Sequence, residues 1–226
     1  MVASRPMSLR EAEAALRSPY APTPGPRKAH VVPLVAATPA SLGRLARLVD
    51  DPAAYPVEIV RWPAQGWRPI DEGSGDQGGV VEGLFETEWR GSTLHGRNHA
   101  VGDAYVFGWS DWPDGDGAEP PPATRRRALI WRANYHPDGG QLVWPVRPGS
   151  AFRVALAPPG DDVVPESFVA FRLDGRQGLY IPPGVWHGPF IPEADQTAFH
   201  DRQGRVHARV SVDFPREFGL YLEIPL

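Results

Sequence analysis

Proline and glycine are spread along the whole chain, and they limit how long any regular element can be. The 226 residues include 27 Pro and 24 Gly. Pro breaks helix interiors, and average proteins hold only roughly 5% of it, so a helical bundle or coiled coil is excluded. Eight Trp, nine Phe and six Tyr supply core material that disordered chains lack. We therefore predict an all-β protein, a barrel or sandwich of short strands joined by tight turns.

Charge and cysteine content narrow the possible partners. The formal net charge is −4, which argues against a nucleic-acid-binding protein with its usual basic stripe. The chain has no Cys, so disulfides, thiolate metal sites and a Cys nucleophile are excluded. No apolar run approaches 18 residues, and no apolar stretch follows Arg5 and Arg10. We expect no membrane association and a cytoplasmic location.

The N-terminal 29 residues differ from the rest of the chain. A short helix is predicted over 8–17, where Ser8 and Glu11 can form a capping box. Four Pro in 18–28 predict an extended arm, packed on a partner subunit or loosely ordered. The arm and the open edges of the sheets favour a homodimer. Residues 30–226 are expected to form a single domain.

Hydrophobic patterns place further elements within this domain. A strand is predicted at 31–38, a helix at 39–50 and strand-like structure at 57–62. Short aromatic strands are expected within 80–112, and a surface loop insertion at about 113–124. Later strands are predicted at 128–133, 141–146, 151–156, 167–173, 178–181, 206–214 and 219–224. The polar residues of 206–214 alternate with apolar ones, which is typical of a solvated strand face.

One short motif resembles a metal-binding motif of cupins, which are small β-barrels of the jelly-roll type. It reads Pro182-x-Gly184-x-x-His187, in which Pro and Gly form a tight turn before a strand that carries the His. The first cupin motif would need His-x-His and an acidic residue. Here Asn134 stands at the first His, His136 at the second, and Gln141 at the acidic position. Transition metals prefer imidazole and carboxylate to neutral amides, so His136, His187 and Gln141 would form at most a weak or accessory metal site.

Several motifs in order resemble the ureidoglycolate lyase family of the cupin superfamily. They are His-Pro-x-Gly-x-Gln at 136–141, Gly-x-Gln-Gly at 175–178, Val-Trp-His at 185–187 followed by Pro189, and a strand with an Asp at 210–213. The segment 31–50 is also similar to the first strand and helix of the family. The resemblance is good from about 128 to 226 and weak between 50 and 127. The segment 62–125 looks expanded relative to bacterial members.

This resemblance implies a cupin-like β-barrel with one or two short N-terminal helices. It also implies cleavage of ureidoglycolate to glyoxylate and urea, a step of allantoin and purine breakdown. In this reaction a base removes the hydroxyl proton, a carbonyl forms and the C–N bond breaks. Histidine suits the role of base because its usual pKa is about 6.5. Arginine suits the substrate carboxylate because of its bidentate fork. No cofactor is certain, although a loosely bound divalent metal is possible.

The candidate residues follow from these requirements. His136 and His187 are the expected bases or metal ligands, and Asp213 would orient an imidazole or take part in proton transfer. Gln141 would orient the substrate, and Arg209 would bind its carboxylate. Trp186 is either a pocket wall or core, and Asn134 and Tyr135 are further candidate substrate contacts.

Two other functional classes stay open at this point. One is a metal-dependent cupin enzyme such as an isomerase or dioxygenase, and the other is a non-catalytic small-molecule-binding cupin. A second His pair, His95 and His99, could share one face of a strand, although a metal site there is the weaker interpretation. Asp111, Asp114 and Asp116 lack the spacing of a calcium loop and predict a solvated loop.

Overall fold

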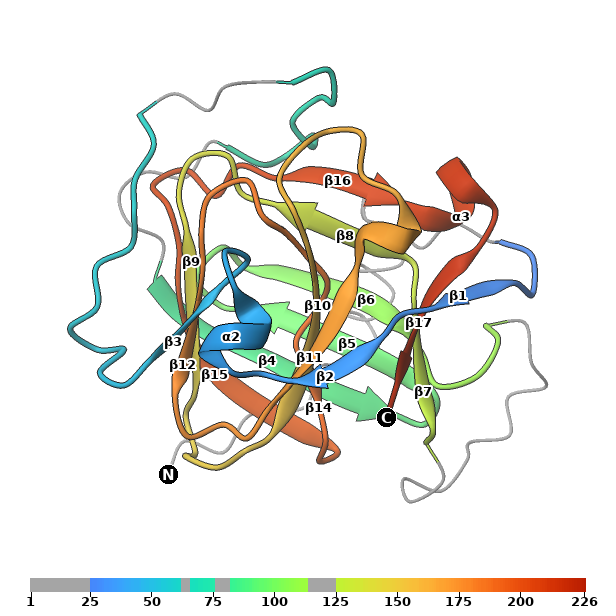
Figure 1. Ribbon diagram of the computed structural model, residues 1–226, viewed down its shortest axis with the longest axis horizontal. Helices are drawn as coiled ribbons and strands as arrows, with labels where there is room; N and C mark the ends of the chain where they lie inside the picture. The colour runs from blue at the N-terminus through green and yellow to red at the C-terminus, as the bar shows by residue number, and fades with distance from the viewer. Residues whose placement is uncertain (1–24, 62–65, 76–81, 114–124) are drawn as a thin grey trace.

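The computed structural model describes residues 25–61, 66–75, 82–113 and 125–226 (Figure 1). The predicted helix at 8–17, most of the N-terminal arm and almost all of the insertion at 113–124 lie outside these ranges. The regular secondary structure of the described residues is almost entirely β-strand, with two short α-helices and one 3₁₀ turn. This confirms the predicted all-β class.

The larger sheet has ten strands in the order β1-β17-β7-β6-β5-β4-β15-β9-β12-β3. In chain order, these are β1 (Ala29–Val31), β3 (Arg47–Val49), β4 (Glu82–Arg90), β5 (Thr93–Asn98), β6 (Asp103–Trp109), β7 (Arg127–Ile130), β9 (Gln141–Pro145), β12 (Gly178–Ile181), β15 (Gln196–Arg202) and β17 (Tyr221–Pro225). Neighbouring strands are antiparallel except at one edge, where β1 runs parallel to β17.

The smaller sheet has the order β16-β8-β13-β10-β11-β2, and β14 also pairs with β10. Its strands are β2 (Leu34–Ala36), β8 (Arg132–Tyr135), β10 (Phe152–Ala157), β11 (Val169–Leu173), β13 (Trp186–His187), β14 (Ile191–Pro192) and β16 (Val210–Asp213). The helical elements are α2 (Pro39–Leu42), the 3₁₀ turn η2 (Pro165–Ser167) and α3 (Phe214–Phe218).

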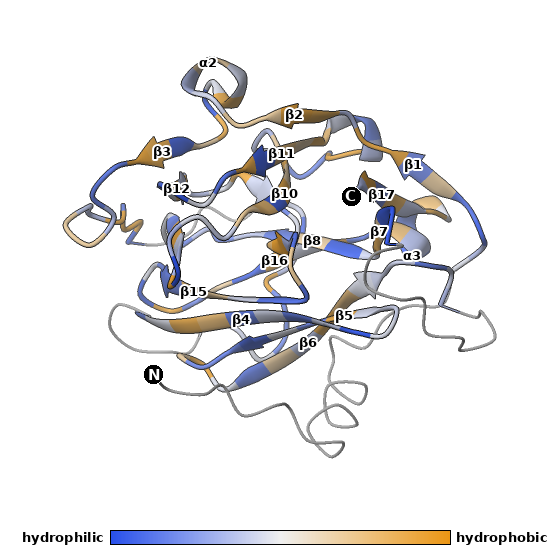
Figure 2. Ribbon diagram, turned by 90° about the horizontal axis from the view of Figure 1, so that it is seen from below, coloured by the Kyte–Doolittle hydropathy of each residue, from blue (hydrophilic) through white to orange (hydrophobic). Residues whose placement is uncertain are grey.

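The two sheets pack against each other over a shared apolar core. Two large clusters of buried side chains each draw residues from both sheets. Phe152 of the smaller sheet, for example, packs edge-on against Phe199 of the larger one, with ring centroids 5.0 Å apart. Seen from below, β4, β5 and β6 form one layer, and β8, β10 and β16 lie above it (Figure 2). The cavity described below is lined by residues of both sheets.

Glycine and proline divide two of the predicted elements. The helix expected at 39–50 ends at Leu42, because Gly43 adopts φ 56°, and residues 47–49 form β3 instead. The strand expected at 31–38 is split at Pro33 into β1 and β2, which belong to different sheets. The N-terminal segment therefore joins the edge of one sheet to the edge of the other.

Two other predicted elements also differ from the structure, and one helix was not predicted. Of the strand-like segment expected at 57–62, the described residues 57–61 make only an isolated bridge, between Ile59 and Gly139. The strand expected at 206–214 is confined to β16, because residues 206–209 form an irregular segment before it. The helix α3 was not predicted, although Asp213 caps it and Pro215 lies in its first turn.

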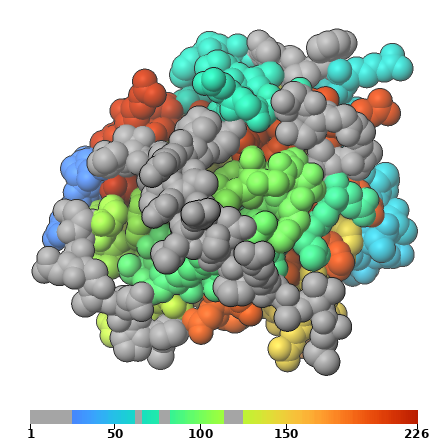
Figure 3. All heavy atoms as spheres, turned by 180° about the vertical axis from the view of Figure 1, so that it is seen from behind, coloured from blue at the N-terminus to red at the C-terminus, as the bar shows by residue number. Residues whose placement is uncertain are grey.

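The segment 66–75 is fixed to the body by one buried arginine. Arg68 is 6% exposed and forms a bidentate pair with Glu217 of α3, with N–O distances of 2.9 and 2.6 Å. Its Nε donates to the carbonyl of Asp161 at 2.7 Å. From behind, this part of the chain lies along the upper margin of the face formed by β4 to β6 (Figure 3). The anchor holds Asp71 in place at the cavity described below.

Across the described ranges, no helix is long and apolar enough to cross a membrane.

Candidate active site

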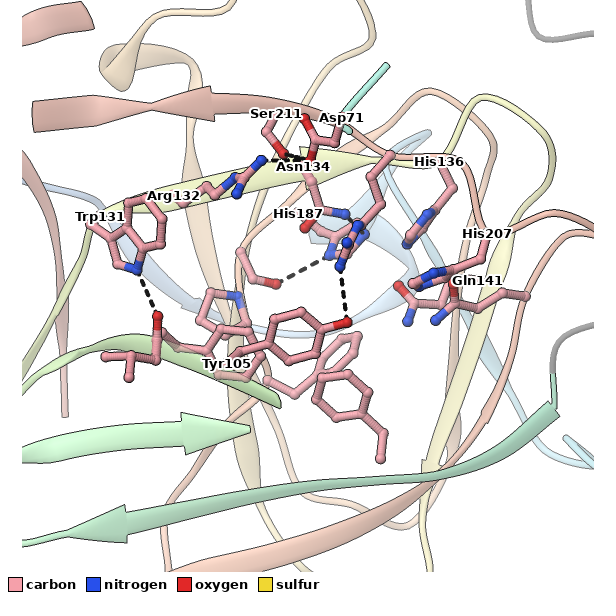
Figure 4. Close-up of a pocket in the computed structure, with 18 residues that line it drawn as sticks. Asp71, Tyr105, Trp131, Arg132, Asn134, His136, Gln141, His187, His207 and Ser211 are labelled. Atoms are coloured by element: carbon pink, nitrogen blue, oxygen red, sulfur yellow. Dashed lines mark hydrogen bonds and ion pairs between the residues drawn. The ribbon is translucent and has the colours of Figure 1, made fainter. Parts of the chain in front are cut away.

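A cavity lies between the two sheets, with polar side chains on one part of its wall and aromatic rings on another (Figure 4). Its volume is about 70 Å³, measured as the space open to the centre of a water molecule. One water needs roughly 10–15 Å³ on this measure, so the cavity suits several waters or a compact organic acid. The lining residues are Asp71, Phe85, Tyr105, Val106, Phe107, Trp131, Arg132, Asn134, His136, Gln141, His187, Gly188, Pro189, Phe190, Gln203, His207, Arg209 and Ser211.

His136 follows β8 and is held in one tautomer by the backbone. Its Nδ1 donates to the carbonyl of Ala208 at 2.9 Å. The pKa of His136 is lowered to about 4, mainly by burial; the hydrogen bond to Ala208 acts to raise it, and the positive charge of Arg209 acts to lower it. The imidazole is therefore neutral at pH 7. Because Nδ1 carries the proton, Nε2 has a free lone pair that can accept a proton.

His187 lies on β13, directly after the turn that the cupin-like motif predicts. Gly184 in that turn has φ 78°, a conformation that favours glycine. The Nδ1 of His187 is 3.2 Å from the carbonyl of Gly188, and its Nε2 is 3.3 Å from the amide nitrogen of Asn134 on β8. Its Nε2 is therefore already engaged by a donor, whereas that of His136 remains an acceptor.

A third histidine completes a buried cluster. The ring of His136 lies 5.3 Å from that of His187 and 5.4 Å from that of His207. Burial, with a smaller contribution from the neighbouring His136, lowers the pKa of His187 to about 3 and that of His207 to about 2. His207 also has φ 51°, which is uncommon for a residue with a side chain. The three imidazoles are therefore neutral at pH 7.

Arg209 supplies positive charge to the same wall. Its Nη1 donates to the hydroxyl of Tyr105 at 2.9 Å, and its Nη2 lies 3.4 Å from a carboxylate oxygen of Asp103. Arg209 as a whole is 6% exposed. A buried guanidinium at a cavity wall is suited to a carboxylate ligand.

A second arginine at the wall also pairs with a carboxylate of the protein. The Nη2 of Arg132 lies 2.5 Å from Oδ2 of Asp71, which also accepts a hydrogen bond from Ser211 at 2.7 Å. Figure 4 shows this group on one side of the cavity and Gln141 with His207 on another. Each of the two arginines at the wall therefore has a carboxylate neighbour within the protein, Asp71 for Arg132 and Asp103 for Arg209.

Gln141 opens β9 and takes part in a buried amide–carboxylate network. Its Nε2 donates to Asp201 at 2.9 Å, and Nε2 of Gln203 donates to the other oxygen of Asp201 at 2.5 Å. The Oε1 atoms of both glutamines are buried and have no hydrogen-bond partner among the described residues. Burial raises the pKa of Asp201 to about 7, while the two amide hydrogen bonds act to lower it.

The structure brings five of the eight candidate residues to the cavity and places three elsewhere. His136, His187, Gln141, Asn134 and Arg209 line it. Asp213 is not among the lining residues, because its carboxylate caps α3 by accepting from the backbone N–H of Arg216 at 3.0 Å. Trp186 is core rather than wall: it is fully buried and donates to the carbonyl of Gly160. Tyr135 packs edge-on against Trp186 and donates to Asp161 at 3.0 Å.

Other cavity residues were missed or undervalued by sequence reasoning. His207 was assigned to a solvated strand face, but it is 3% exposed and lines the cavity. Asp71, Tyr105 and Gln203 carry no local motif, because distant segments bring them to the site. Alternation of polar residues cannot distinguish a solvated face from one that faces a cavity.

The fit of a metal ion can be judged from the donor atoms. Within the described ranges, no group of three or more His, Asp or Glu side chains could hold a metal ion. The Nε2 of His187 faces an amide donor, and Gln141 turns its nitrogen toward Asp201. The donor set as arranged does not fit a metal centre.

The second histidine pair lies outside this cavity. His95 is on β5, and His99, just after this strand, pairs with Glu86 at 2.6 Å. The groove that contains His95 and Glu86 is lined by residues of both charge signs.

The middle and C-terminal parts of the chain resemble known enzymes. Residues 128–210 match the family model of ureidoglycolate lyase. This region contains His136, Gln141, His187 and Arg209. A ureidoglycolate lyase of Azotobacter vinelandii is 42% identical over 71 residues, covering 30% of this chain and 42% of that protein. Those of Stutzerimonas stutzeri and Pseudomonas entomophila are 44% identical over 78 residues and 38% identical over 89.

The similarity to ureidoglycolate lyases is partial. The S. stutzeri alignment covers 34% of this chain and 45% of the relative, and the P. entomophila alignment covers 38% and 53%. The chain thus spans about half the length of the curated relatives that it matches. Asp71 and Tyr105 lie outside the region that matches the lyase family model, so part of the cavity wall comes from other segments of this chain.

Proposed function

We propose that this protein is a carbon–nitrogen lyase that cleaves ureidoglycolate to glyoxylate and urea. The observation that carries the proposal is the cavity that joins His136, Gln141 and Arg209, all within the region similar to ureidoglycolate lyases. A neutral imidazole, an amide and a guanidinium are the groups that an anionic hydroxy-ureido acid requires.

The proposed reaction begins at His136. Its Nε2 takes the proton of the substrate hydroxyl, and the electron pair of the O–H bond forms the carbonyl of glyoxylate. The C–N bond breaks, and its electron pair stays on the urea nitrogen. The proton on His136 then passes to that nitrogen. Every atom of the substrate is found in glyoxylate or urea, and neither water nor an oxidant is consumed.

The negative charge of the substrate would raise the pKa of the catalytic base. The positive charge of Arg209 lowers the pKa of both His136 and His207. A carboxylate bound to Arg209 offsets that charge and raises the proton affinity of the nearby imidazole. Binding of the anionic substrate and activation of the base are coupled in this way.

The test is release of glyoxylate from ureidoglycolate by the purified protein, with and without added divalent ion and against an enzyme-free blank. We expect glyoxylate well above the blank. No glyoxylate under either condition would refute the assignment of this substrate.

Arg209 gives a first prediction about binding. Arg209→Gln should raise KM for ureidoglycolate by about 10- to 100-fold, because a charge-assisted contact with the carboxylate is lost. Arg209→Lys keeps the positive charge but loses the bidentate guanidinium, so its KM should lie between those of wild type and Arg209→Gln. Steady-state kinetics on both variants, with the exposed Arg176→Gln as a control, measures this. A KM for Arg209→Gln within twofold of wild type would contradict the role.

We further propose that the protein is a cytoplasmic homodimer. The described edge strands β1 and β2 expose Val31 and Val35 at 57% and 37%, which supports pairing through this region. Light scattering should give twice the chain mass of 24.8 kDa. A mass of one chain at all concentrations would contradict the dimer.

A further inference from the structure

Two buried amide oxygens at the cavity wall have no partner within the described ranges. They are Oε1 of Gln141 and Oε1 of Gln203, and the two side chains are 3% and 1% exposed. Buried polar atoms are almost always hydrogen-bonded, so an unpaired one in a functional cavity calls for an explanation. Two such atoms, both acceptors and both on residues that line one cavity, suggest that a ligand supplies the missing donors.

The orientation of both amides is set by one carboxylate. Asp201 on β15 accepts Nε2 of Gln141 on Oδ1 and Nε2 of Gln203 on Oδ2. An ionised carboxylate only accepts hydrogen bonds, so each glutamine must turn its nitrogen toward Asp201 and its oxygen away. Asp201 is itself absent from the lining of the cavity. It can therefore influence a ligand only through the two glutamines.

A third amide completes the surroundings of Asp201. Nδ2 of Asn98 donates to Oδ2 of Asp201 at 3.4 Å, while Oδ1 of Asn98 accepts from the backbone N–H of Ala100 at 3.0 Å. Asn98 is thus fixed in its own orientation and cannot offer Asp201 an acceptor. The network has one stable arrangement when Asp201 is ionised.

We propose that Asp201 is a positioning residue that makes Gln141 and Gln203 a pair of acceptors for the N–H groups of a urea or primary amide in the ligand. The proposal rests on the proposed function, because it assigns the ureido end of the substrate to this part of the wall. It also defines specificity: a terminal NH₂ is selected, and a methyl group of the same size is rejected. Burial of two unpaired acceptors against a methyl group is unfavourable, which is how polar sites discriminate between isosteres.

Two small acids test the selection without any turnover. Ureidoacetate carries a urea and a carboxylate but no hydroxyl, so the proposed lyase reaction cannot cleave it. N-acetylglycine differs from it only by a methyl group in place of the terminal NH₂. Calorimetric titration at pH 8, above the pKa of about 7 that burial gives Asp201, should show wild type binding ureidoacetate at least about tenfold more tightly.

Asp201→Asn should reduce this preference to about twofold or less. The new amide offers both a donor and an acceptor, so a glutamine can turn its nitrogen toward the cavity. Affinity for N-acetylglycine should stay within about threefold of wild type. Asp50→Asn is the matched control: Asp50 accepts from Gln177 at 2.6 Å in an exposed Asp–Gln pair away from the cavity. It should keep the wild-type preference.

Other outcomes would overturn the proposal. Equal binding of the two acids by wild type, or an unchanged preference in Asp201→Asn, would refute it. If Asp201→Asn does not fold, Gln203→Met removes one acceptor at similar size and should also lower the preference; an unchanged ratio there would refute the proposal. A preference for ureidoacetate in a protein that releases no glyoxylate would leave the ureido site standing and reject only the lyase reaction.

Discussion

Replacing His136 with Ala is expected to lower kcat/KM for ureidoglycolate cleavage by about 10²- to 10⁴-fold, the usual contribution of a positioned general base. The reason is structural: Nδ1 of His136 donates to the carbonyl of Ala208, which leaves Nε2 as the acceptor. The loss should fall mainly on kcat, because Arg209 still binds the substrate carboxylate. Steady-state kinetics with a glyoxylate assay measures both constants.

His99→Gln is the matched control for this variant, because His99 is 39% exposed and pairs with Glu86 away from the cavity. It should keep wild-type kinetics. Unfolding curves should show that His136→Ala still folds cooperatively. A folded His136→Ala protein with more than a tenth of wild-type kcat would contradict the assignment of His136 as the base and would direct attention to His187 or His207.

The second large effect is a loss of stability on acidification of the unliganded protein. Burial holds the pKa of His136, His187 and His207 at about 4, 3 and 2, below the usual 6.5. Below pH 6.5 these histidines are therefore protonated in the unfolded chain but not in the folded protein. Each of them lowers the free energy of unfolding by about 1.4 kcal/mol per pH unit. His95, with a pKa lowered by burial to about 4, acts in the same direction.

Asp201 opposes this trend. Its pKa is raised from 3.8 to about 7, so between these values the folded state binds the extra proton and gains stability as the pH falls. Four buried histidines act against the single Asp201, so the free energy of unfolding should still fall by several kcal/mol between pH 6.5 and pH 5. Denaturant titrations at pH 7.5, 6 and 5 measure the change.

Two substitutions separate these contributions. His207→Asn removes one histidine that is protonated only on unfolding, so the free energy of unfolding should change less steeply with pH. Asn also tolerates the positive φ of this position. Asp201→Asn should make the dependence steeper, because the opposing titration is lost. A free energy of unfolding that stays constant from pH 7 to pH 5 in wild type would contradict the buried, neutral histidine cluster.

The parts of the site that sequence could predict are those set by local chemistry. Pro182 and Gly184 predict a turn from their own conformational preferences, and His187 follows this turn on β13 as expected. The His-Pro-x-Gly-x-Gln run likewise places His136 and Gln141 at the two ends of one turn, and both reach the cavity. The content of Pro and Gly was enough for the all-β class, because it forbids long helices.

The parts that sequence could not predict depend on contacts between distant segments. The pairing of Asp201 with Gln141 joins positions 60 residues apart, and the contact of Arg209 with Tyr105 spans 104. The alternating pattern places Asp213 on the same strand face as Ser211. In the structure β16 ends at Asp213, and α3 begins directly after it. The Asp-x-Pro signal of a helix N-terminus was present at 213–215, and it accounts for the Asp213 carboxylate better than catalysis does.

The most direct test of the central claim is an analysis of the products formed from ¹³C-labelled ureidoglycolate. Followed by ¹³C NMR with wild-type protein, the reaction should yield glyoxylate and urea in equal amounts, and no ammonia should be detected by a parallel chemical assay. His136→Ala should give neither product above the enzyme-free blank in the same period. Release of ammonia in place of urea, or no reaction of the wild type, would contradict C–N lyase chemistry at this cavity.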